Sequence, residues 1–158
     1  MPVRDTQQKV IRDKAYAYIV HSFCNREHIL VFRHLDFPEA GIQIPGGTVE
    51  PGEPVQAAVT REAHEETGLS NLQIARKLGL VKRDMQTFGL NEIHHRHYFH
   101  LSLTSDPQAT WIAYEETPSD GSEGPIAFRF FWVPLDQVPT LAGDLDESLA
   151  VLRQSLNQ

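Results

Sequence analysis

Short hydrophobic and β-branched stretches, separated by turn residues, run along most of the chain. Residues 14–23 and 28–34 flank the polar turn at 25–27 and therefore predict a β-hairpin. The same pattern predicts further strands at residues 41–45, 72–81, 93–103, 110–114 and 127–134. Gly46 and Gly47 are expected to close the short strand 41–45. Residues 115–125 are rich in Glu, Ser, Gly and Pro and predict a surface loop.

Two segments show helical rather than strand periodicity. Residues 53–67 form the first predicted helix, with Pro54 suited to a first helical turn and Gly68 to a C-terminal stop. Residues 145–156 form the second, since their leucines recur at helical spacing. Strands and helices that interleave in this way predict an α/β fold, with a mixed sheet covered by helices. No repeat or linker divides the chain, so residues 1–158 are expected to form a single domain.

The helix at residues 53–67 has an unusual arrangement of charge. At about 100° per residue, its apolar stripe consists of Val55, Ala58, Val59 and Ala63. Three glutamates fall on or beside that stripe, namely Glu62, Glu65 and Glu66. A surface helix normally turns its carboxylates away from the protein body, and partly buried carboxylates need a cation or a proton. Oxygen ligands favour Mg²⁺ or Mn²⁺ over Zn²⁺. The alternative is a solvated run of charges without a function.

The overall charge restricts the ligands that the protein is expected to bind. The chain carries 14 basic and 21 acidic residues, a formal net charge of -7. This argues against a broad surface for DNA or long RNA, whereas a bound cation would still allow a small anionic ligand. Cys24 is the single cysteine, so no internal disulfide forms, and a cytoplasmic location is expected. No apolar run is long enough to span a membrane. A homodimer is compatible with the sequence, which does not demand one.

The spacing around the three glutamates is more specific than their charge. The segment 47–69 resembles the Nudix box, in which Gly, Glu, Arg-Glu, Glu-Glu and Gly recur at fixed distances. The matching positions are Gly47, Glu53, Arg61, Glu62, Ala63, Glu65, Glu66, Gly68 and Leu69. Outside the box, the Ile-Pro-Gly-Gly sequence at 44–47 and the late strand at 131–135 are also similar to the family.

The resemblance implies an α/β/α sandwich with a central mixed sheet. It also implies metal-dependent hydrolysis of a diphosphate bond in a nucleoside diphosphate linked to another group. In the family, divalent ions bind the glutamates that correspond to Glu62, Glu65 and Glu66. The backbone of Gly46 and Gly47 would then contact metal or phosphate.

The resemblance also assigns roles around the metal. Glu53 would assist the site, either through a water molecule at the metal or by contacting Arg61. Arg61 is expected to orient carboxylates rather than touch the substrate. The general base is Glu66 or Glu65, or a residue of a later loop, where Glu115, Glu116 and Glu123 are the candidates. The sequence does not choose among these carboxylates.

Four residues outside the box are candidates for binding the substrate. In the histidine-rich strand at 94–100, alternation places Arg96 and Tyr98 on one face, where they would contact a phosphate and stack on a base. Trp111 would also stack on a base, and a basic residue at the end of a strand, Arg33 with His34 beside it, would bind a terminal phosphate or a ribose-linked group. The alternative is a polar strand with packed or solvated histidines, with Arg33 simply exposed at a strand end.

The leading hypothesis is therefore a nucleotide pyrophosphohydrolase that uses Mg²⁺, or alternatively Mn²⁺. Its substrate would be a nucleoside triphosphate, a nucleotide sugar, ADP-ribose or a dinucleoside polyphosphate. A non-catalytic module that senses a nucleotide is the main alternative, and an isomerase on the same scaffold is the second. Both alternatives usually depart from the strict box, whereas this chain keeps every glutamate of it.

Overall fold

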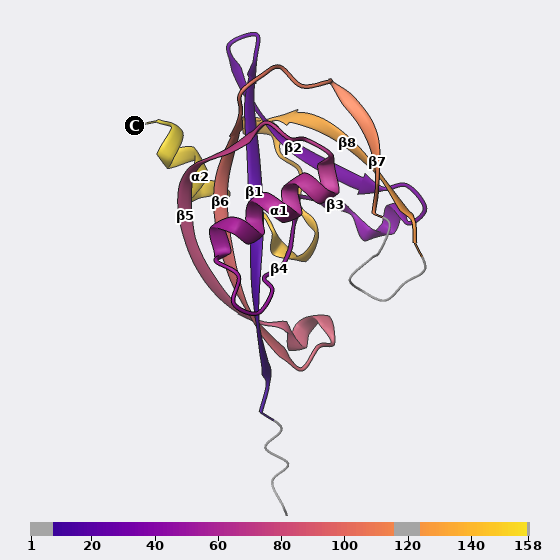
Figure 1. Ribbon diagram of the computed structural model, residues 1–158, viewed down its shortest axis with the longest axis vertical. Helices are drawn as coiled ribbons and strands as arrows, with labels where there is room; N and C mark the ends of the chain where they lie inside the picture. Colours follow the sequence, from indigo (N-terminus) through magenta and orange to yellow (C-terminus); the bar gives the residue numbers. More distant parts are fainter. Residues whose placement is uncertain (1–7, 116–123, 158) are drawn as a thin grey trace, which may run out of the picture.

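The computed structural model of the chain describes residues 8–115 and 124–157. In it, one mixed sheet carries two α-helices (Figure 1). The strands are β1 (Val10–Phe23), β2 (Arg26–His34), β3 (Ile42–Gln43), β4 (Gly46–Thr48), β5 (Leu72–Asp84), β6 (Glu92–Leu103), β7 (Thr110–Glu115) and β8 (Ile126–Pro134). The helices are α1 (Val55–Thr67) and α2 (Leu149–Leu156), with 3-10 turns η1 (Pro38–Ala40), η2 (Met85–Phe88), η3 (Leu135–Gln137) and η4 (Ala142–Asp144). Neither α-helix is long and apolar enough for a membrane span, and the same holds for every helix in the described ranges.

The strand order confirms the predicted α/β/α sandwich with a central mixed sheet. The order is β5-β6-β1-β2-β8-β7, with β3 attached to β2 and β4 to β1. The pairing of β1 with β6 is parallel, and the other pairings are antiparallel. The parallel pair brings the histidine-rich strand β6 directly beside β1, between β1 and the edge strand β5.

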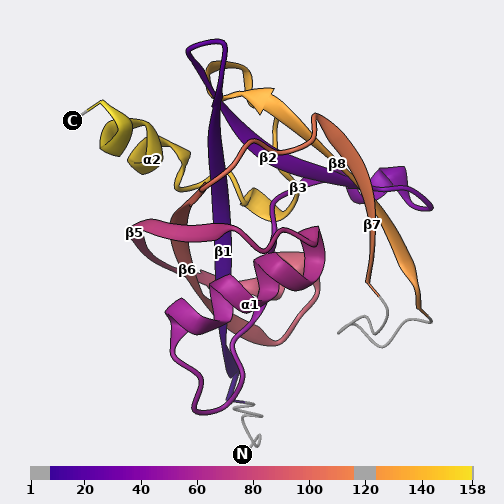
Figure 2. The same cartoon turned by 45° about the horizontal axis from the view of Figure 1, so that its top comes forward.

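The two faces of the sheet carry separate hydrophobic clusters, because successive strand residues point to opposite sides. On β1, Ala15 and Ala17 pack with Ala58 of α1 in one cluster. Tyr18 of the same strand packs with Leu152 of α2 in the other. The helices therefore cover opposite faces, and they lie well apart in the turned view (Figure 2).

Most predicted elements begin or end at a different residue in the structure; β1, for example, begins at Val10 rather than at residue 14. The first helix begins at Val55 rather than at residue 53, because Pro54 has an extended backbone (φ -63°, ψ 142°) and stands at the N-cap. The second begins at Leu149 rather than at residue 145, since residues 142–148 form η4 and turns. The predicted strand 41–45 is instead β3, and Gly46 begins a strand of its own, β4.

Candidate active site

Helix α1 is held against the sheet by the small residues of its apolar stripe. Ala58, Val59 and Ala63 are completely buried, as the wheel predicts. The helix ends at Gly68, whose left-handed conformation (φ 78°) lets its amide donate to the carbonyl of His64 at 2.8 Å. Alanine at two of the three contact positions lets the helix backbone approach the sheet closely, which brings the longer glutamates of the same face within reach of β4.

The three box glutamates differ in their burial. Glu66 is 8% exposed, and the Glu62 side chain is 17% exposed. The Glu65 side chain is 57% exposed, so the prediction that all three point toward the protein body holds for two of them. Consecutive helix residues lie about 100° apart, which places Glu66 at the centre of the stripe and Glu65 at its edge.

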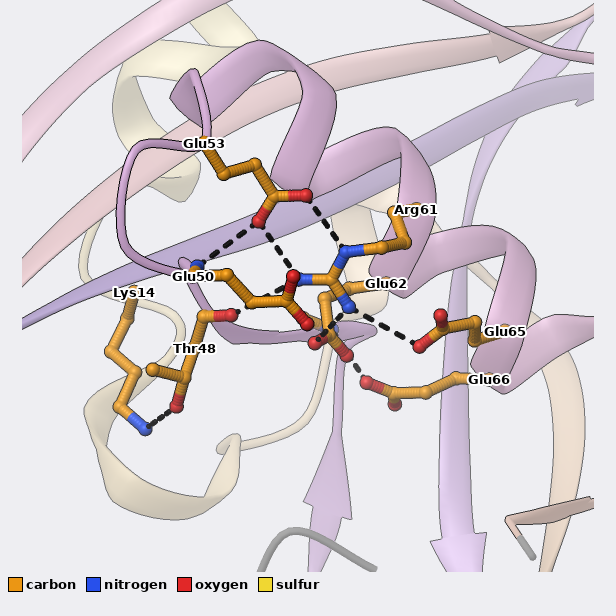
Figure 3. A network of polar contacts seen from close by, with 9 residues as sticks. Lys14, Thr48, Glu50, Glu53, Arg61, Glu62, Glu65 and Glu66 are labelled. Carbon is orange, nitrogen blue, oxygen red and sulfur yellow. Dashed lines mark hydrogen bonds and ion pairs between the residues drawn. The ribbon is translucent and has the colours of Figure 1, made fainter. Parts of the chain in front are cut away.

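Arg61 gathers three glutamates around one guanidinium (Figure 3). Its Nε and Nη2 donate to the two oxygens of Glu53 at 2.8 and 2.9 Å, a bidentate pair. Its Nη1 donates to Glu62 at 2.9 Å and to Glu65 at 3.3 Å. Nη2 also donates to the carbonyl of Thr48 at 3.2 Å, which ties the helix to the end of β4. Arg61 therefore positions carboxylates in this structure.

The ionised Glu53 carboxylate should stabilise the folded protein at pH values above 4.5, the ordinary pKa of this group. The hydrogen bonds from Arg61, and then that from the Glu50 amide, lower the pKa of Glu53 from 4.5 to about 2. A lowered folded-state pKa gives stability that is present above pH 4.5 and lost as pH falls toward 2. In urea unfolding, we expect Glu53→Gln to have a lower free energy of unfolding than wild type above about pH 5. The two values should become equal as pH falls toward 2. A difference independent of pH would contradict this assignment.

The double glycine of β4 lies directly against the carboxylates of α1. The Gly46 amide donates to Oε1 of Glu66 at 3.2 Å. A Cβ atom added at Gly47 would lie 2.4 Å from the carboxyl carbon of Glu62, so only glycine leaves room for that carboxylate. The antiparallel pairing of β4 with β1 fixes both positions, since Gly46 lies opposite Tyr16 and Gly47 opposite Ala15.

The described residues compensate the negative charge of Glu62 and Glu66 only in part, and the pKa values of both carboxyl groups are raised. Burial raises the pKa of Glu66 well above 4.5, and the neighbouring carboxylates of Glu62 and Glu115 raise it further against the Gly46 hydrogen bond. Burial also raises the pKa of Glu62, although Arg61 opposes this. A cation placed among these oxygens would remove both effects, which is the electrostatic property expected of a metal site.

A cavity of about 310 Å³ opens beside these carboxylates. It is lined by Phe32, His34, Ala40, Gln43, Gly46, Glu62, Glu66, Glu115, Ile126 and Phe128. Of the three later glutamates that are candidates for the general base, Glu115 lines the cavity. Glu116 and Glu123 lie outside the residues that the structure describes. The lining combines acidic oxygens with aromatic and aliphatic surface, which is the composition of a site for an organic group next to a charged one.

Arg96 and Tyr98 lie on the opposite face of the sheet from α1. Tyr98 is fully buried in the cluster under α2. Arg96 is 2% exposed and donates to Glu147 at 3.0 Å and to the carbonyl of Gly143 at 2.7 Å. The predicted alternation of the strand is therefore correct, but it places these two residues in the α2 core rather than in the cavity.

Arg33 and Trp111 also lie outside the described lining of the cavity. Arg33 is exposed on the other face of β2, with its guanidinium 5.6 Å from the ring of Phe131. Trp111 is on the α1 face, where its ring stacks on Phe130 at 5.4 Å and its Nε1 donates to the carbonyl of Thr67 at 2.9 Å. Trp111 thus fastens the end of α1 to β7.

Replacing Trp111 with phenylalanine should reduce stability and leave hydrolysis nearly unchanged. The smaller ring keeps the contact with Phe130, but the hydrogen bond to Thr67 is lost. We expect the free energy of unfolding to fall by about 1 kcal/mol. Urea unfolding and steady-state kinetics on the same preparation check both parts. A large rise in KM at normal stability would instead support the predicted stacking of Trp111 on substrate.

Several residues of the cavity lining are missed by motif reasoning. Phe32, His34 and Phe128 belong to no signature, yet strand alternation gives a usable signal. Leu30 and Phe32 pack toward α1, so His34, two residues further along β2, points to the same side and Arg33 to the other. The sequence alone does not show which side α1 covers, and the choice between Arg33 and His34 depends on that.

Comparison with known proteins decides the family. The NUDIX domain profile matches residues 14–154. The chain belongs to the Nudix family. No curated protein matches the chain in sequence. The profile match runs from within β1 to within α2 and includes the glutamate helix α1. The predicted class, a Nudix hydrolase and therefore an enzyme of the pyrophosphatase type, is confirmed.

Solved Nudix structures share the fold over nearly the whole chain. A C. elegans Ap4A hydrolase has 19% identity and a TM-score of 0.63, with 94% of this chain and 98% of that chain covered. A MutT NUDIX hydrolase from Burkholderia pseudomallei has 25% identity and a TM-score of 0.62, covering 90% and 98%. An ADP-ribose pyrophosphatase from Streptococcus suis has 22% identity and a TM-score of 0.56, covering 93% and 92%. The first and the third of these proteins differ in the substrates that their names state, so the shared fold leaves the substrate of this chain open.

Proposed function

We propose that this Nudix hydrolase cleaves a diphosphate bond in a nucleoside diphosphate linked to another group, with Mg²⁺ or Mn²⁺ bound by Glu62, Glu65 and Glu66. The observation that carries the proposal is the buried Glu66 beside the partly buried Glu62, both against the Gly46-Gly47 backbone and next to the cavity. Arg61 compensates only part of this negative charge, because its guanidinium is shared with Glu53 and Glu65, and a divalent ion would relieve the remaining cost.

The donor atoms fit a hard divalent ion. Every candidate ligand is a carboxylate or backbone oxygen, the type that Mg²⁺ and Mn²⁺ prefer. In the described residues, no three acidic or histidine side chains are already grouped as a metal site. Glu62 and Glu65 are paired with Arg61 instead, so rotation of the partly exposed Glu65 side chain would complete the set.

The residues of the chain would have distinct tasks in the reaction. Bound metal would neutralise the diphosphate and make its phosphorus easier for water to attack. Arg61, fixed by Glu53, would hold the Glu62 carboxylate beside the cavity. The proton of the attacking water goes to a carboxylate, and Glu66 and Glu115 line the cavity while Glu65 stands exposed on the same helix. The general base is one of these three.

The cavity supports a substrate with an organic group beside its diphosphate. Phe32, Phe128 and Ile126 supply apolar contact, and Gln43 supplies a side-chain donor and acceptor. We therefore assign substrate contact to these residues in place of Arg33, Arg96, Tyr98 and Trp111, which lie outside the described lining of the cavity. The net charge of -7 supports small nucleotides over DNA or long RNA, and the single cysteine fits the cytoplasmic setting that we propose.

A substrate panel tests the proposal. Purified protein is incubated with Mg²⁺ or Mn²⁺ and with nucleoside triphosphates, nucleotide sugars, ADP-ribose and dinucleoside polyphosphates, and the products are separated by chromatography. We expect cleavage within the diphosphate of at least one class, abolished by EDTA and by Glu66→Gln, but kept by the surface control Glu27→Gln. Tight metal-dependent binding of one compound without turnover would overturn the proposal in favour of a sensing module.

A further inference from the structure

Three tyrosine rings form a column under the sheet on the α2 face. The ring of Tyr98 lies between the other two, 5.6 Å from Tyr16 and 5.3 Å from Tyr18, with interplanar angles of 27° and 23°. Tyr18 and Tyr98 are completely buried. The rings come from the adjacent parallel strands β1 and β6, so the sheet itself fixes their spacing.

The end of the column at Tyr18 is fixed to the segment before α2. The Tyr18 hydroxyl donates to the carbonyl of Leu145 at 2.6 Å and accepts from the amide of Ser148 at 3.2 Å. The Tyr98 hydroxyl donates to Glu147. Each of these bonds joins residues far apart in the chain, and together they prevent the rings from sliding along the sheet.

Arg96 adds a second constraint on the column. Its guanidinium lies 5.8 Å from the centre of the Tyr16 ring, in cation–π range. The same group is bonded to Glu147 and to the Gly143 carbonyl, so it cannot move freely. Tyr16 is therefore confined by Tyr98 and by Arg96.

The free end of the column touches the active site. A Cβ atom at Gly46 would lie 2.3 Å from Cδ1 of Tyr16, which shows that the Gly46 backbone rests on the edge of that ring. Gly46 has no side chain to hold it. Backbone hydrogen bonds tie its surroundings to β1, from the Ala17 amide to the Pro45 carbonyl at 2.8 Å and from the Val49 amide to the Asp13 carbonyl at 2.9 Å. The Gly46 amide itself donates to Glu66 rather than to β1, so its exact position also depends on what supports it from the α2 side.

We infer that Tyr16 is a positioning residue, whose ring holds the Gly46 amide against the Glu66 carboxylate from the opposite face of the sheet. The metal part of this inference rests on the proposed function, whereas the support of the amide does not. Glu66 needs one oxygen fixed by Gly46 so that its other oxygen is presented in a constant direction. Arg96 and Tyr98 then serve the site indirectly, by confining the ring of Tyr16.

The test replaces Tyr16 with leucine, which removes the ring, and with phenylalanine, which keeps it. Hydrogen exchange of the Gly46 amide is followed by NMR in metal-free protein, and Mn²⁺ affinity is measured separately by electron paramagnetic resonance. We expect Tyr16→Leu to speed exchange of the Gly46 amide and to weaken Mn²⁺ binding by about 10- to 100-fold, the usual effect of losing a group that orients a metal ligand. Tyr16→Phe should match wild type in both.

Tyr18→Leu is the matched control, because it removes a ring of the same column that does not contact Gly46. It should lower the melting temperature but speed Gly46 exchange much less than Tyr16→Leu does, because Tyr16 keeps its contacts with Tyr98 and Arg96. Equal effects of Tyr18→Leu and Tyr16→Leu, or wild-type Gly46 exchange in Tyr16→Leu, would overturn the inference. If Tyr16→Leu does not fold, Tyr16→Met fills the space without a flat ring and is read in the same way. Absence of Mn²⁺ binding in wild type would overturn the proposed metal while the exchange data still decide the role of Tyr16.

Discussion

Glu66→Gln should abolish hydrolysis and yet make the metal-free protein more stable near pH 8. Glutamine keeps the acceptor for the Gly46 amide but removes a buried negative charge beside Glu62 and Glu115. We expect activity to fall by more than about 100-fold, because the charged oxygen that binds metal is gone. The free energy of unfolding in EDTA should rise by about 1–3 kcal/mol, the cost of an uncompensated buried polar group.

The pH dependence of this gain follows from the raised pKa of Glu66. The folded state holds that proton more tightly than the unfolded state, so wild type loses stability as pH rises from 4.5 through the raised pKa. Glu66→Gln lacks this loss, and the two proteins should converge toward pH 4.5. Urea unfolding across this range measures the difference. Adding Mg²⁺ or Mn²⁺ should stabilise wild type alone.

Glu65→Gln provides the comparison on the same helix. Its side chain is 57% exposed, so removing its charge should change the stability in EDTA by less than about 0.5 kcal/mol. A stability gain as large as that of Glu66→Gln would show that general charge on α1, rather than burial of Glu66, is responsible. A loss of stability in Glu66→Gln would contradict the argument directly.

The glutamate helix is predictable because its information is local. The positions of Val59, Ala63 and Glu66 on the wheel show which side faces the sheet before any fold is known. The same wheel places Glu65 about 100° from Glu66, and the structure shows the former exposed and the latter buried. Grouping all three carboxylates as one inward patch therefore overestimated how wide the buried face of α1 is.

The cavity lining is not predictable from the same kind of reasoning. Alternation along β6 correctly pairs Arg96 with Tyr98, but alternation does not say which face of the sheet receives α1. That depends on the order of the strands and on the path of β4 beside β1, which are set by contacts between residues far apart in the chain. A buried arginine on a strand has the same local pattern whether it meets a phosphate or, as here, Glu147.

Alanine should affect the two glycines of β4 differently, lowering the stability at Gly46 and the activity at Gly47. Neither has a positive φ, so alanine fits their backbone conformation and only the surrounding space decides. At Gly46, a Cβ atom would lie 2.5 Å from the carbonyl oxygen of Ala15 and 3.0 Å from Cα of Tyr16. These are backbone atoms of β1, so Gly46→Ala must push β4 away. We expect its free energy of unfolding to fall by about 1–3 kcal/mol.

At Gly47, the new Cβ atom would meet only the carboxyl group of Glu62, at 2.4 to 2.7 Å. That group is the end of a flexible side chain, which can turn aside at little cost. Gly47→Ala should therefore change the unfolding energy by less than about 0.5 kcal/mol, and lower kcat by about 10-fold or more because Glu62 leaves its place. Unfolding curves and steady-state kinetics of both variants show the contrast.

The double variant Gly47→Ala with Glu62→Gln tests whether alanine at residue 47 lowers kcat by displacing the Glu62 carboxylate. If alanine acts by displacing Glu62, a protein already altered at Glu62 has little more to lose, and the two effects on kcat should not add. Additive losses would show that the Gly47 backbone serves the reaction independently, through its own contact with metal or phosphate. Non-additive losses would mean that the second glycine of the box is required chiefly because the Glu62 carboxylate occupies the space that a side chain at residue 47 would fill.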